Sequence, residues 1–170
     1  MKNIVLIGFM GTGKTEIGRL LAQKLALTYI DTDSIIEENE GRSINDIFAS
    51  SGEESFREME SKVLDSLKDK KNLVISTGGG IVLRPGNVIK MKNLGPLVLL
   101  WASPEAIYER IKDAGARPLL NVADQMAKIK VILDFRTPIY KNITDFEVDT
   151  TRLSPEVACN KIIKFIGKDK

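Results

Sequence analysis

Short apolar segments alternate with longer amphipathic segments along the whole chain. The first short segment, Ile4-Val5-Leu6-Ile7, is a continuous apolar run rich in β-branched residues, a pattern typical of strands buried in a parallel sheet. We predict five such strands, at residues 3–7, 28–31, 73–76, 97–101 and 145–148. Because helical patterns separate each strand from the next, the order indicates βαβ units and an α/β fold built on a parallel sheet.

The longer segments carry apolar residues three and four positions apart, as amphipathic helices do. The predicted helices cover residues 14–26, 33–40, 43–49, 53–69, 86–91, 104–114, 123–135 and 155–166. About forty residues of helical pattern separate the second and third strands, whereas a simple crossover needs only about a dozen. We therefore expect residues 32–70 to form a helical, substrate-binding insertion over the carboxyl edge of the sheet, where ligands of open α/β sheets bind.

A second segment of interest, residues 115–121, reads Gly-Ala-Arg-Pro-Leu-Leu-Asn and joins two helical patterns. Its glycine, proline and arginine suit a mobile lid, which we place at about residues 112–124. An ordinary surface loop accounts for the same composition equally well. No repeat, linker or low-complexity segment interrupts the chain, so we expect residues 1–170 to form a single domain.

A glycine-rich stretch follows the first strand directly. It runs from Gly8 to Thr15 with the spacing glycine, four residues, glycine, lysine, threonine. Between a strand and a helix, such a loop turns backbone N–H groups toward phosphate, and the helix dipole adds partial positive charge. Lys14 is expected to reach the outer phosphates, and the Thr15 hydroxyl to ligate magnesium. A glycine-rich turn without a ligand is the alternative, but the flanking strand and helix favour a nucleotide site.

Composition narrows the choice of function. The 170 residues suit one domain, and a net charge of +2 does not require nucleic acid or an acidic membrane as partner. The chain has no histidine, which excludes histidine-based triads, metal sites and general bases. Cys159 is the only cysteine, so no disulfide forms within the chain and the cytoplasm is the expected compartment. No apolar run approaches the ~20 residues of a membrane span, and the N-terminal segment resembles a core strand rather than a signal peptide.

Two carboxylates, Asp31 and Asp33, follow the second strand. Alternation in an extended segment would point both the same way, about 7 Å apart. We assign Asp31 to the magnesium side and Asp33 to a substrate hydroxyl, because many P-loop enzymes hold magnesium with a strand-end aspartate. The third strand ends in a threonine and glycines and offers no carboxylate for this role. Alternatively, Asp33 is an ordinary N-cap of the helix that begins at Ser34.

Three consecutive glycines, Gly78-Gly79-Gly80, follow the third strand. Glycines cost backbone entropy and pack nothing, so a run of three needs a reason. The reason that we favour is close approach of the backbone to a ligand, with N–H groups that meet hydroxyls or a carboxylate. A tight structural turn is the alternative interpretation of the same three residues.

Four arginines adjoin the segments that we expect to line the cleft: Arg57, Arg110, Arg117 and Arg136. The planar guanidinium suits carboxylates and phosphates, although most single arginines are exposed. Arg57 lies beside Glu60 on a helical pattern, and we expect an ion pair between them at the edge of the core. Arg136 comes just before Pro138, which is expected to end or kink the helix.

In order and spacing, these motifs resemble the shikimate kinases, a family within the nucleoside-monophosphate-kinase-like P-loop proteins. The resemblance covers essentially the whole chain and includes the glycine loop 8–15, Asp31-Thr32-Asp33, Phe56-Arg57, the glycines 78–80, Arg117-Pro118-Leu119-Leu120, and Arg136 with Tyr140. It implies a three-layer P-loop fold with a five-stranded parallel sheet flanked by helices, a lid and a shikimate-binding helical region. It also implies ATP-dependent phosphorylation of the 3-hydroxyl of shikimate, a step toward chorismate and the aromatic amino acids.

The resemblance further implies a role for individual residues. Asp33 would be the catalytic base, and the catalytic cations Lys14 and Arg117 would act on the transferring phosphoryl group. Magnesium would bind Thr15 directly, with Asp31 behind it. The residues implied to bind shikimate are Asp33, Arg57, Gly78, Gly79, Gly80 and Arg136. Those implied to bind ATP are Gly11, Thr12, Gly13, Lys14, Thr15, Glu16, Arg110, Arg117 and Arg152.

Two positions depart from the family pattern. Glu16 stands where a small hydroxyl residue is usual, and we expect its carboxylate to point outward. Ala116 replaces a glycine before Arg117, which is expected to stiffen the lid. Two rival functions stay open: a kinase of the same fold acting on gluconate or a nucleoside monophosphate, and a nucleotide-binding module that regulates a partner without catalysis. A monomer is the expected oligomeric state.

Overall fold

The computed structural model describes residues 3–112 and 122–167. Its centre is a five-stranded sheet in the order β2-β3-β1-β4-β5, with every neighbouring pair parallel. The strands are β1 (Ile4–Ile7), β2 (Thr28–Asp31), β3 (Leu73–Ser76), β4 (Leu97–Trp101) and β5 (Phe146–Asp149). The predicted five-stranded parallel sheet is therefore confirmed, and each predicted strand lies within one residue of its observed bounds.

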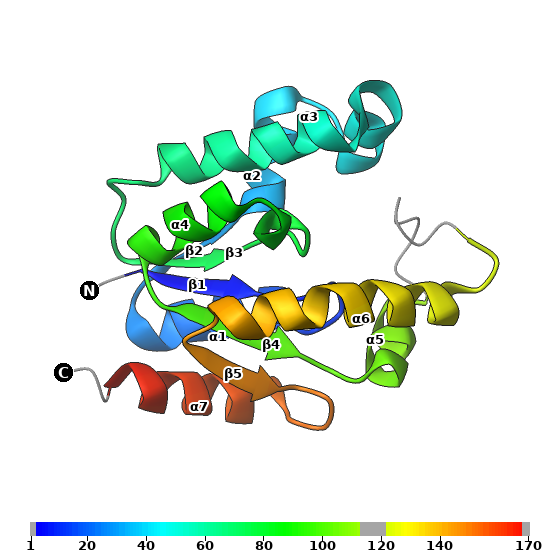
Figure 1. Ribbon diagram of the computed structural model, residues 1–170. Coiled ribbons are helices and arrows are strands. Elements are labelled where there is room, and N and C mark those ends of the chain that lie inside the picture. Colours follow the sequence, from blue (N-terminus) through cyan, green and yellow to red (C-terminus); the bar gives the residue numbers. More distant parts are fainter. Residues whose placement is uncertain (1–2, 113–121, 168–170) are drawn as a thin grey trace.

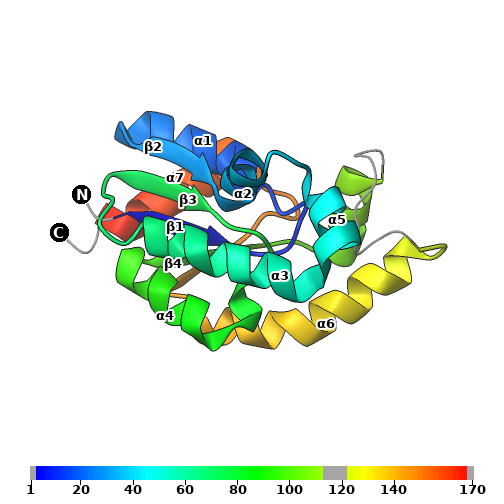
Figure 2. The same cartoon turned by 90° about the horizontal axis from the view of Figure 1, so that it is seen from above.

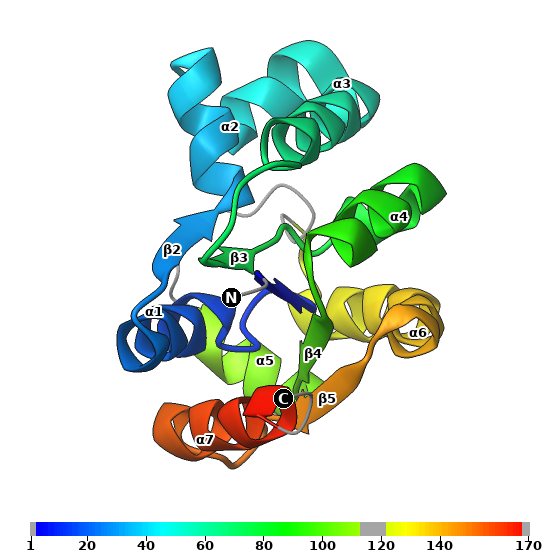
Figure 3. The same ribbon diagram turned by 90° about the vertical axis from the view of Figure 1, so that its left-hand side faces the viewer.

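Helices connect these strands and cover both faces of the sheet. They are α1 (Lys14–Leu25), α2 (Thr32–Glu40), α3 (Ile44–Ser66), α4 (Pro85–Leu94), α5 (Pro104–Ile111), α6 (Gln125–Ile143) and α7 (Pro155–Ile166), with a short 3-10 turn at Ile81–Leu83. Helices α1 and α7 lie on one side of the sheet, and α4 and α6 lie on the other (Figure 3). The predicted three-layer architecture is thereby confirmed (Figure 1).

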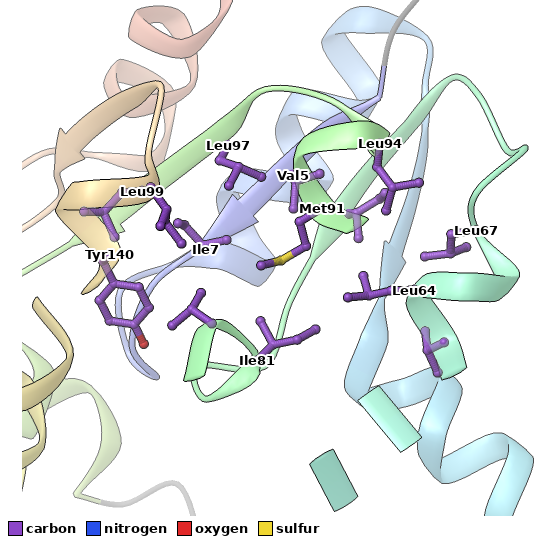
Figure 4. Close-up of a cluster of buried hydrophobic side chains, with 14 of the residues drawn as sticks. Val5, Ile7, Leu64, Leu67, Ile81, Met91, Leu94, Leu97, Leu99 and Tyr140 are labelled. Carbon is purple, nitrogen blue, oxygen red and sulfur yellow. The ribbon is translucent and has the colours of Figure 1, made fainter. Parts of the chain in front are cut away.

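The central strand β1 shows why the chain folds into layers. Successive side chains of a strand point to opposite faces, so Ile4 and Leu6 join a core with α1 and α7. Val5 and Ile7 join the larger core on the other face, beneath α3, α4 and the end of α6. Figure 4 shows this second core, with Met91 of α4 beside β1 and the Tyr140 ring beside Leu99. A strand apolar on both faces needs a helix layer on each.

Helix α6 runs further than the sequence predicted. An end at residue 135, before Pro138, was the expectation, but the helix continues to Ile143 with Pro138 inside it. A proline at this position removes the hydrogen bond to the carbonyl of Asp134. Both Asp134 and Pro138 are exposed, so water can satisfy that carbonyl. Burial of Tyr140 and Ile143 in the core holds the last turn in place.

The long helix α3 is broken at Gly52, which has φ 76° and ψ 171°. The break separates residues 44–51 from residues 53–66 and matches the two helices predicted at 43–49 and 53–69. A glycine tolerates this positive φ without strain. Residues 32–40 and 44–66 are helical. Most of the lid expected at residues 112–124 lies outside the described residues, because residues 113–121 are not described.

All five parallel strands run toward the end of the sheet where α5 and the first turns of α3 lie (Figure 2). In an open α/β sheet, ligands bind beyond these carboxyl ends. Within residues 3–112 and 122–167, no helix has both the length and the apolar character needed to cross a bilayer.

Candidate active site

A cavity of about 670 Å³ opens beyond the carboxyl ends of β1, β2 and β3. Its lining includes the glycine loop after β1, the two aspartates after β2 and the three glycines after β3, with side chains of α3 and α6 closing the far side. The structure thus brings together segments that lie more than a hundred residues apart in the chain. Most of the predicted site residues belong to this lining.

The glycine loop is shaped by positive φ angles and by close packing. Gly11 and Gly13 have φ of 74° and 90°, and a Cβ on Gly8 would lie 2.1 Å from the carbonyl oxygen of Leu100. Only glycine fits these places without strain. The loop leads directly into α1, and the first three residues of that helix, 14–16, line the cavity. Lys14 Nζ donates to the carbonyls of Gly8 and Phe9 at 2.8 Å, which holds this cation over the loop.

Asp31 and Asp33 both line the cavity, but not in the way that strand alternation predicted. Helix α2 begins at Thr32, so Asp33 lies in its first turn rather than in an extended segment. Asp31 is the N-cap, and its Oδ1 accepts the Asp33 N–H at 3.0 Å. The expectation that alternation aligns the two carboxylates was wrong, and so was the alternative that Asp33 is the cap. Asp33 is thereby left available for other chemistry.

The Asp33 carboxyl is buried and its Oδ1 has no hydrogen-bond partner within the described structure. Burial raises the pKa of Asp33 to about 6, and the neighbouring Asp31 adds to the rise, while Lys14 and Arg57 oppose it. An unpartnered buried oxygen is costly to leave unbonded. In a cavity of this kind, it is a natural acceptor for a ligand hydroxyl.

Arg57 and Arg136 are buried arginines that line the same cavity, each 5% exposed. Arg57 belongs to the second half of α3 and Arg136 to α6. The Nε atom of each is buried and has no partner in the described structure. Buried arginines are rare without compensation, so two that share one cavity indicate a site for an anion.

The predicted ion pair of Arg57 with Glu60 is present, with Nη1 donating to Oε2 at 2.8 Å. A second bond joins Arg57 to Glu53, also at 2.8 Å. Glu60 is fully buried, and its Oε1 has no partner in the described structure. Burial raises the pKa of Glu60 to about 7, against the opposing effect of Arg57. The sequence indicated Glu60 only as an ion-pair partner, although its place on the apolar side of the helix could have marked it as buried.

The three glycines after β3 are explained by the side chains around them. A Cβ on Gly80 would lie 2.1 Å from Arg57 Nη2, and one on Gly78 would lie 2.6 Å from Asp33 Oδ1. Gly79 faces Arg136, with its Cβ position 3.6 Å from Nη1. A side chain at position 78 or 80 would therefore displace Asp33 or Arg57 from its place in the cavity. The interpretation of a simple turn does not account for these contacts.

Tyr140 of α6 contacts the loop of glycines 78–80 next to Arg136. Its hydroxyl donates to the Gly79 carbonyl and also interacts with Arg136. Burial raises the pKa of Tyr140 to about 12, with Arg136 opposing the rise, so the phenol keeps its proton at neutral pH. The contact ties the end of α6 to the loop after β3.

A second cavity, of about 400 Å³, lies on the other side of the glycine loop. Arg110 borders it and donates to the carbonyls of Gly11 and Thr150, at 3.0 and 2.6 Å. Thr150 in turn donates through its hydroxyl to the Thr12 carbonyl, which joins the loop after β5 to the glycine loop. Arg152 is exposed, and it is not among the described residues that line either cavity.

The remaining predicted residues are placed as follows. Thr15 and Glu16 are exposed at the start of α1, and Glu16 borders both cavities. Arg117 and Ala116 lie outside the described residues.

Glu60→Gln is expected to remove a pH-dependent loss of stability. The pKa of Glu60 is about 7 in the folded protein and has an ordinary value of 4.5. Between these values the folded protein keeps a proton that the unfolded chain has released, so the free energy of unfolding falls as pH rises. We therefore compare the difference in Tm between the parent protein and Glu60→Gln, parent minus variant, and expect this difference to be larger at pH 5 than at pH 8.

Thermal unfolding followed by circular dichroism measures this difference. Glu58→Gln, on the exposed side of the same helix, controls for the loss of one carboxylate. A Tm difference between parent and Glu60→Gln that is the same at both pH values would contradict the assignment.

The glycine loop between β1 and α1, the sheet order and the buried anion site next to the loop define a P-loop phosphotransferase of the small-molecule kinase class. Comparison with known proteins identifies the group within that class. The sequence model of the family described as shikimate kinase matches residues 10–167. This protein belongs to the shikimate kinase family.

Individual relatives agree with that assignment. The chain is 49% identical to the shikimate kinase of Caldicellulosiruptor bescii over 163 residues, which cover 96% of this chain and 94% of that protein. It is 46% identical to the shikimate kinase of Thermodesulfovibrio yellowstonii, with the same shares covered. Among solved structures, the shikimate kinase from Acinetobacter baumannii in complex with shikimate superposes with a TM-score of 0.95 at 35% identity, over 100% of this chain and 95% of that one.

Proposed function

We propose that this protein transfers the terminal phosphoryl group of ATP to the 3-hydroxyl of shikimate, which yields shikimate 3-phosphate on the route to chorismate and the aromatic amino acids. One observation carries the proposal. Two buried arginines and the buried, unpartnered Oδ1 of Asp33 converge on Gly78–Gly80 in the same cavity as the nucleotide-binding loop. The cavity therefore suits an acceptor with both a carboxylate and hydroxyl groups.

The acceptor carboxylate would lie between Arg57 and Arg136. The unpartnered Nε atoms of these arginines would then gain an anionic acceptor, which offsets the cost of their burial. Guanidinium groups bind carboxylates through paired, charge-assisted hydrogen bonds that fix orientation as well as position. The clamp would leave the acceptor little freedom to rotate.

In this arrangement, Asp33 is the base. Its Oδ1 would accept the proton of the attacking hydroxyl as that oxygen bonds to the γ-phosphorus. The bond from the γ-phosphorus to the β–γ bridging oxygen breaks, and ADP leaves with the electron pair. Phosphoryl transfer depends mostly on positioning and on neutralising charge, and a carboxylate held beside a clamped acceptor supplies the positioning.

The nucleotide would lie along the glycine loop. The backbone of Gly11–Gly13 and the N-terminal turn of α1, including Thr15 and Glu16, would surround the phosphates. Lys14 already lies over the loop and would shift from its carbonyl partners to the outer phosphates. The cavity beside Arg110 suits the adenine end, with Arg152 in the neighbouring turn. The resemblance to the family implies that Arg117 would contact the transferring phosphates.

Two oxygen-bearing side chains suit magnesium, one in the first turn of α1 and one at the end of β2. The Thr15 hydroxyl and the Asp31 carboxylate line the same cavity, and both are hard ligands of the kind that magnesium prefers. Within the described residues, no cluster of three or more carboxylate or cysteine groups could form an all-protein metal site. Two protein groups with phosphates and waters are the usual arrangement for this ion. When bound, magnesium would neutralise charge on the phosphate oxygens.

A panel of acceptors tests the proposed activity. We expect ADP release in a coupled assay with ATP, magnesium and shikimate, and rates at least a hundredfold lower with gluconate or a nucleoside monophosphate. Gluconate and nucleoside monophosphates also carry an anion, but they do not place a hydroxyl at the same distance and direction from it, and a misplacement of about 1 Å costs roughly 10²-fold. Faster turnover of another acceptor would contradict the assignment to shikimate. Tight ATP binding without ADP release would instead favour a regulatory nucleotide-binding module.

We also propose that the protein acts as a cytoplasmic monomer without nucleic-acid or membrane partners. The near-neutral net charge of +2 and a single, buried cysteine support this view. Sedimentation at micromolar concentration would test the oligomeric state.

A further inference from the structure

Tyr29 is a phenol in the cavity wall to which the proposed reaction gives no role. It lies on β2, and its hydroxyl donates to Asp31 Oδ2 at 3.1 Å. The same phenol interacts with the side chains of Thr15 and Ser76. One phenol oxygen therefore links Asp31, at the end of β2, with Thr15, in the first turn of α1. These are the two groups proposed to hold magnesium.

The position of the Tyr29 ring is fixed by its neighbours on α1, the helix that packs beside β2 (Figure 3). A Cβ on Gly18 would lie 2.7 Å from the ring atom Cε2, so the ring rests directly on the helix backbone. The guanidinium carbon of Arg19 lies 5.6 Å from the ring centroid, within the range of a cation–π contact. Because Tyr29 and Asp31 are two residues apart on one strand, their side chains share a face. The hydroxyl is consequently directed at the carboxylate.

Asp31 receives one hydrogen bond on each oxygen. Oδ1 accepts the Asp33 N–H at 3.0 Å, and Oδ2 accepts the Tyr29 hydroxyl at 3.1 Å. Two donors on different oxygens fix the plane of the carboxylate, whereas one donor would leave it free to rotate. Each oxygen keeps a second lone pair for a metal ion or its waters. Hydrogen bonds of this kind orient ligands around metal ions in proteins.

We propose that Tyr29 is a positioning residue for the metal side of the active site: its hydroxyl holds the Asp31 carboxylate in register with the Thr15 hydroxyl. The inference rests on the proposed function, which assigns Thr15 and Asp31 to magnesium. Tyr29 does not touch the acceptor or the transferring phosphoryl group in this scheme. It acts through Asp31.

Tyr29→Phe is the direct test, because it removes the hydroxyl and keeps the ring that packs on Gly18. Manganese serves as the probe, and its binding to the ADP-bound protein is measured by electron paramagnetic resonance. Loss of a group that orients a metal ligand weakens metal affinity by roughly 10- to 100-fold. We expect about a tenfold loss here, the low end, because the variant keeps the Asp31 carboxylate and its hydrogen bond from the Asp33 N–H. Affinity for ADP without metal should be unchanged.

Two further variants make the result decisive. Tyr108→Phe removes a phenol hydroxyl from α5, on the core around Phe9, and should leave manganese affinity unchanged. Asp31→Asn should weaken manganese binding at least as much as Tyr29→Phe.

If Asp31→Asn weakens binding and Tyr29→Phe does not, the role of Tyr29 is refuted while the magnesium site stands. If neither variant weakens it, both assignments fail, and the acceptor panel still decides the kinase activity independently. A lower Tm for Tyr29→Phe with unchanged manganese affinity would mean that the hydroxyl only stabilises the fold, and the inference would be wrong.

Discussion

Asp33→Asn is expected to lower kcat with shikimate by about 10²- to 10⁴-fold, the range that a positioned general base contributes. The Asn side chain keeps the size of the carboxyl group but cannot take the hydroxyl proton. Steady-state kinetics with both substrates varied would measure the effect. Because Asp33 belongs to the first turn of α2 and donates its N–H to Asp31 rather than to the glycine loop, ATP affinity should stay within about twofold, well under 1.4 kcal/mol.

The control for this variant is Asp134→Asn, which removes an exposed carboxylate from α6. It should leave both kcat and ATP affinity unchanged. A kcat for Asp33→Asn within threefold of the parent value would exclude Asp33 as the base. Loss of ATP binding in the same variant would mean that Asp33 organises the nucleotide site instead.

Truncation of either buried arginine is expected to weaken shikimate binding with little change in ATP binding. Removing one charge-assisted contact costs about 1.5–3 kcal/mol, so Arg57→Ala or Arg136→Ala should raise the KM for shikimate about 10- to 150-fold. The Arg57 variant also leaves Glu60 buried without its cation, so its Tm should fall more than that of the Arg136 variant.

Arg42→Ala provides a matched control, because Arg42 pairs with Glu40 nearer the surface and is not among the described residues of either cavity. Its KM for shikimate should equal that of the parent protein. An unchanged KM in both the Arg57 and Arg136 variants would refute the clamp.

The glycine loop was predictable because its signal is local. The strand before Gly8, the spacing to Lys14 and the helix after Thr15 all lie within about twenty residues. The alternation of apolar runs and amphipathic segments likewise predicted the parallel sheet, since its three central strands, β1, β3 and β4, are buried on both faces. Here, local preference and tertiary packing agree.

The geometry around Asp31 could not be predicted from alternation. Strand alternation and helix capping compete over the same three residues, and capping by Asp31 starts α2 one residue earlier than expected. The continuation of α6 past Pro138 has a similar cause, because burial of Tyr140 outweighs a local helix-breaking preference. In both places, capping or tertiary packing outweighs the preference of the local sequence.

The convergence of Arg57, Arg136 and the glycines 78–80 depends on contacts between segments far apart in the chain. The sequence indicated each group by its place next to a cleft segment, and the structure places them around one cavity. The buried, unpartnered oxygen of Glu60 had no local signal beyond its spacing from Arg57. The spacing of Tyr29 and Asp31 within β2 could have indicated that their side chains share a face. The interaction of Tyr29 with Thr15 joins β2 to α1, and no local pattern predicts it.

The break of α3 at Gly52 divides the helix into two segments that contact different parts of the protein. The second segment, which bears Arg57, contacts α4 and the residue before it through the pairs Glu54–Arg84, Ser61–Asn87 and Asp65–Lys90. A tilt of residues 44–51 about the glycine would therefore leave the guanidinium anchored. The helix segment that carries the proposed carboxylate-binding guanidinium is thus anchored to α4 independently of the segment before Gly52.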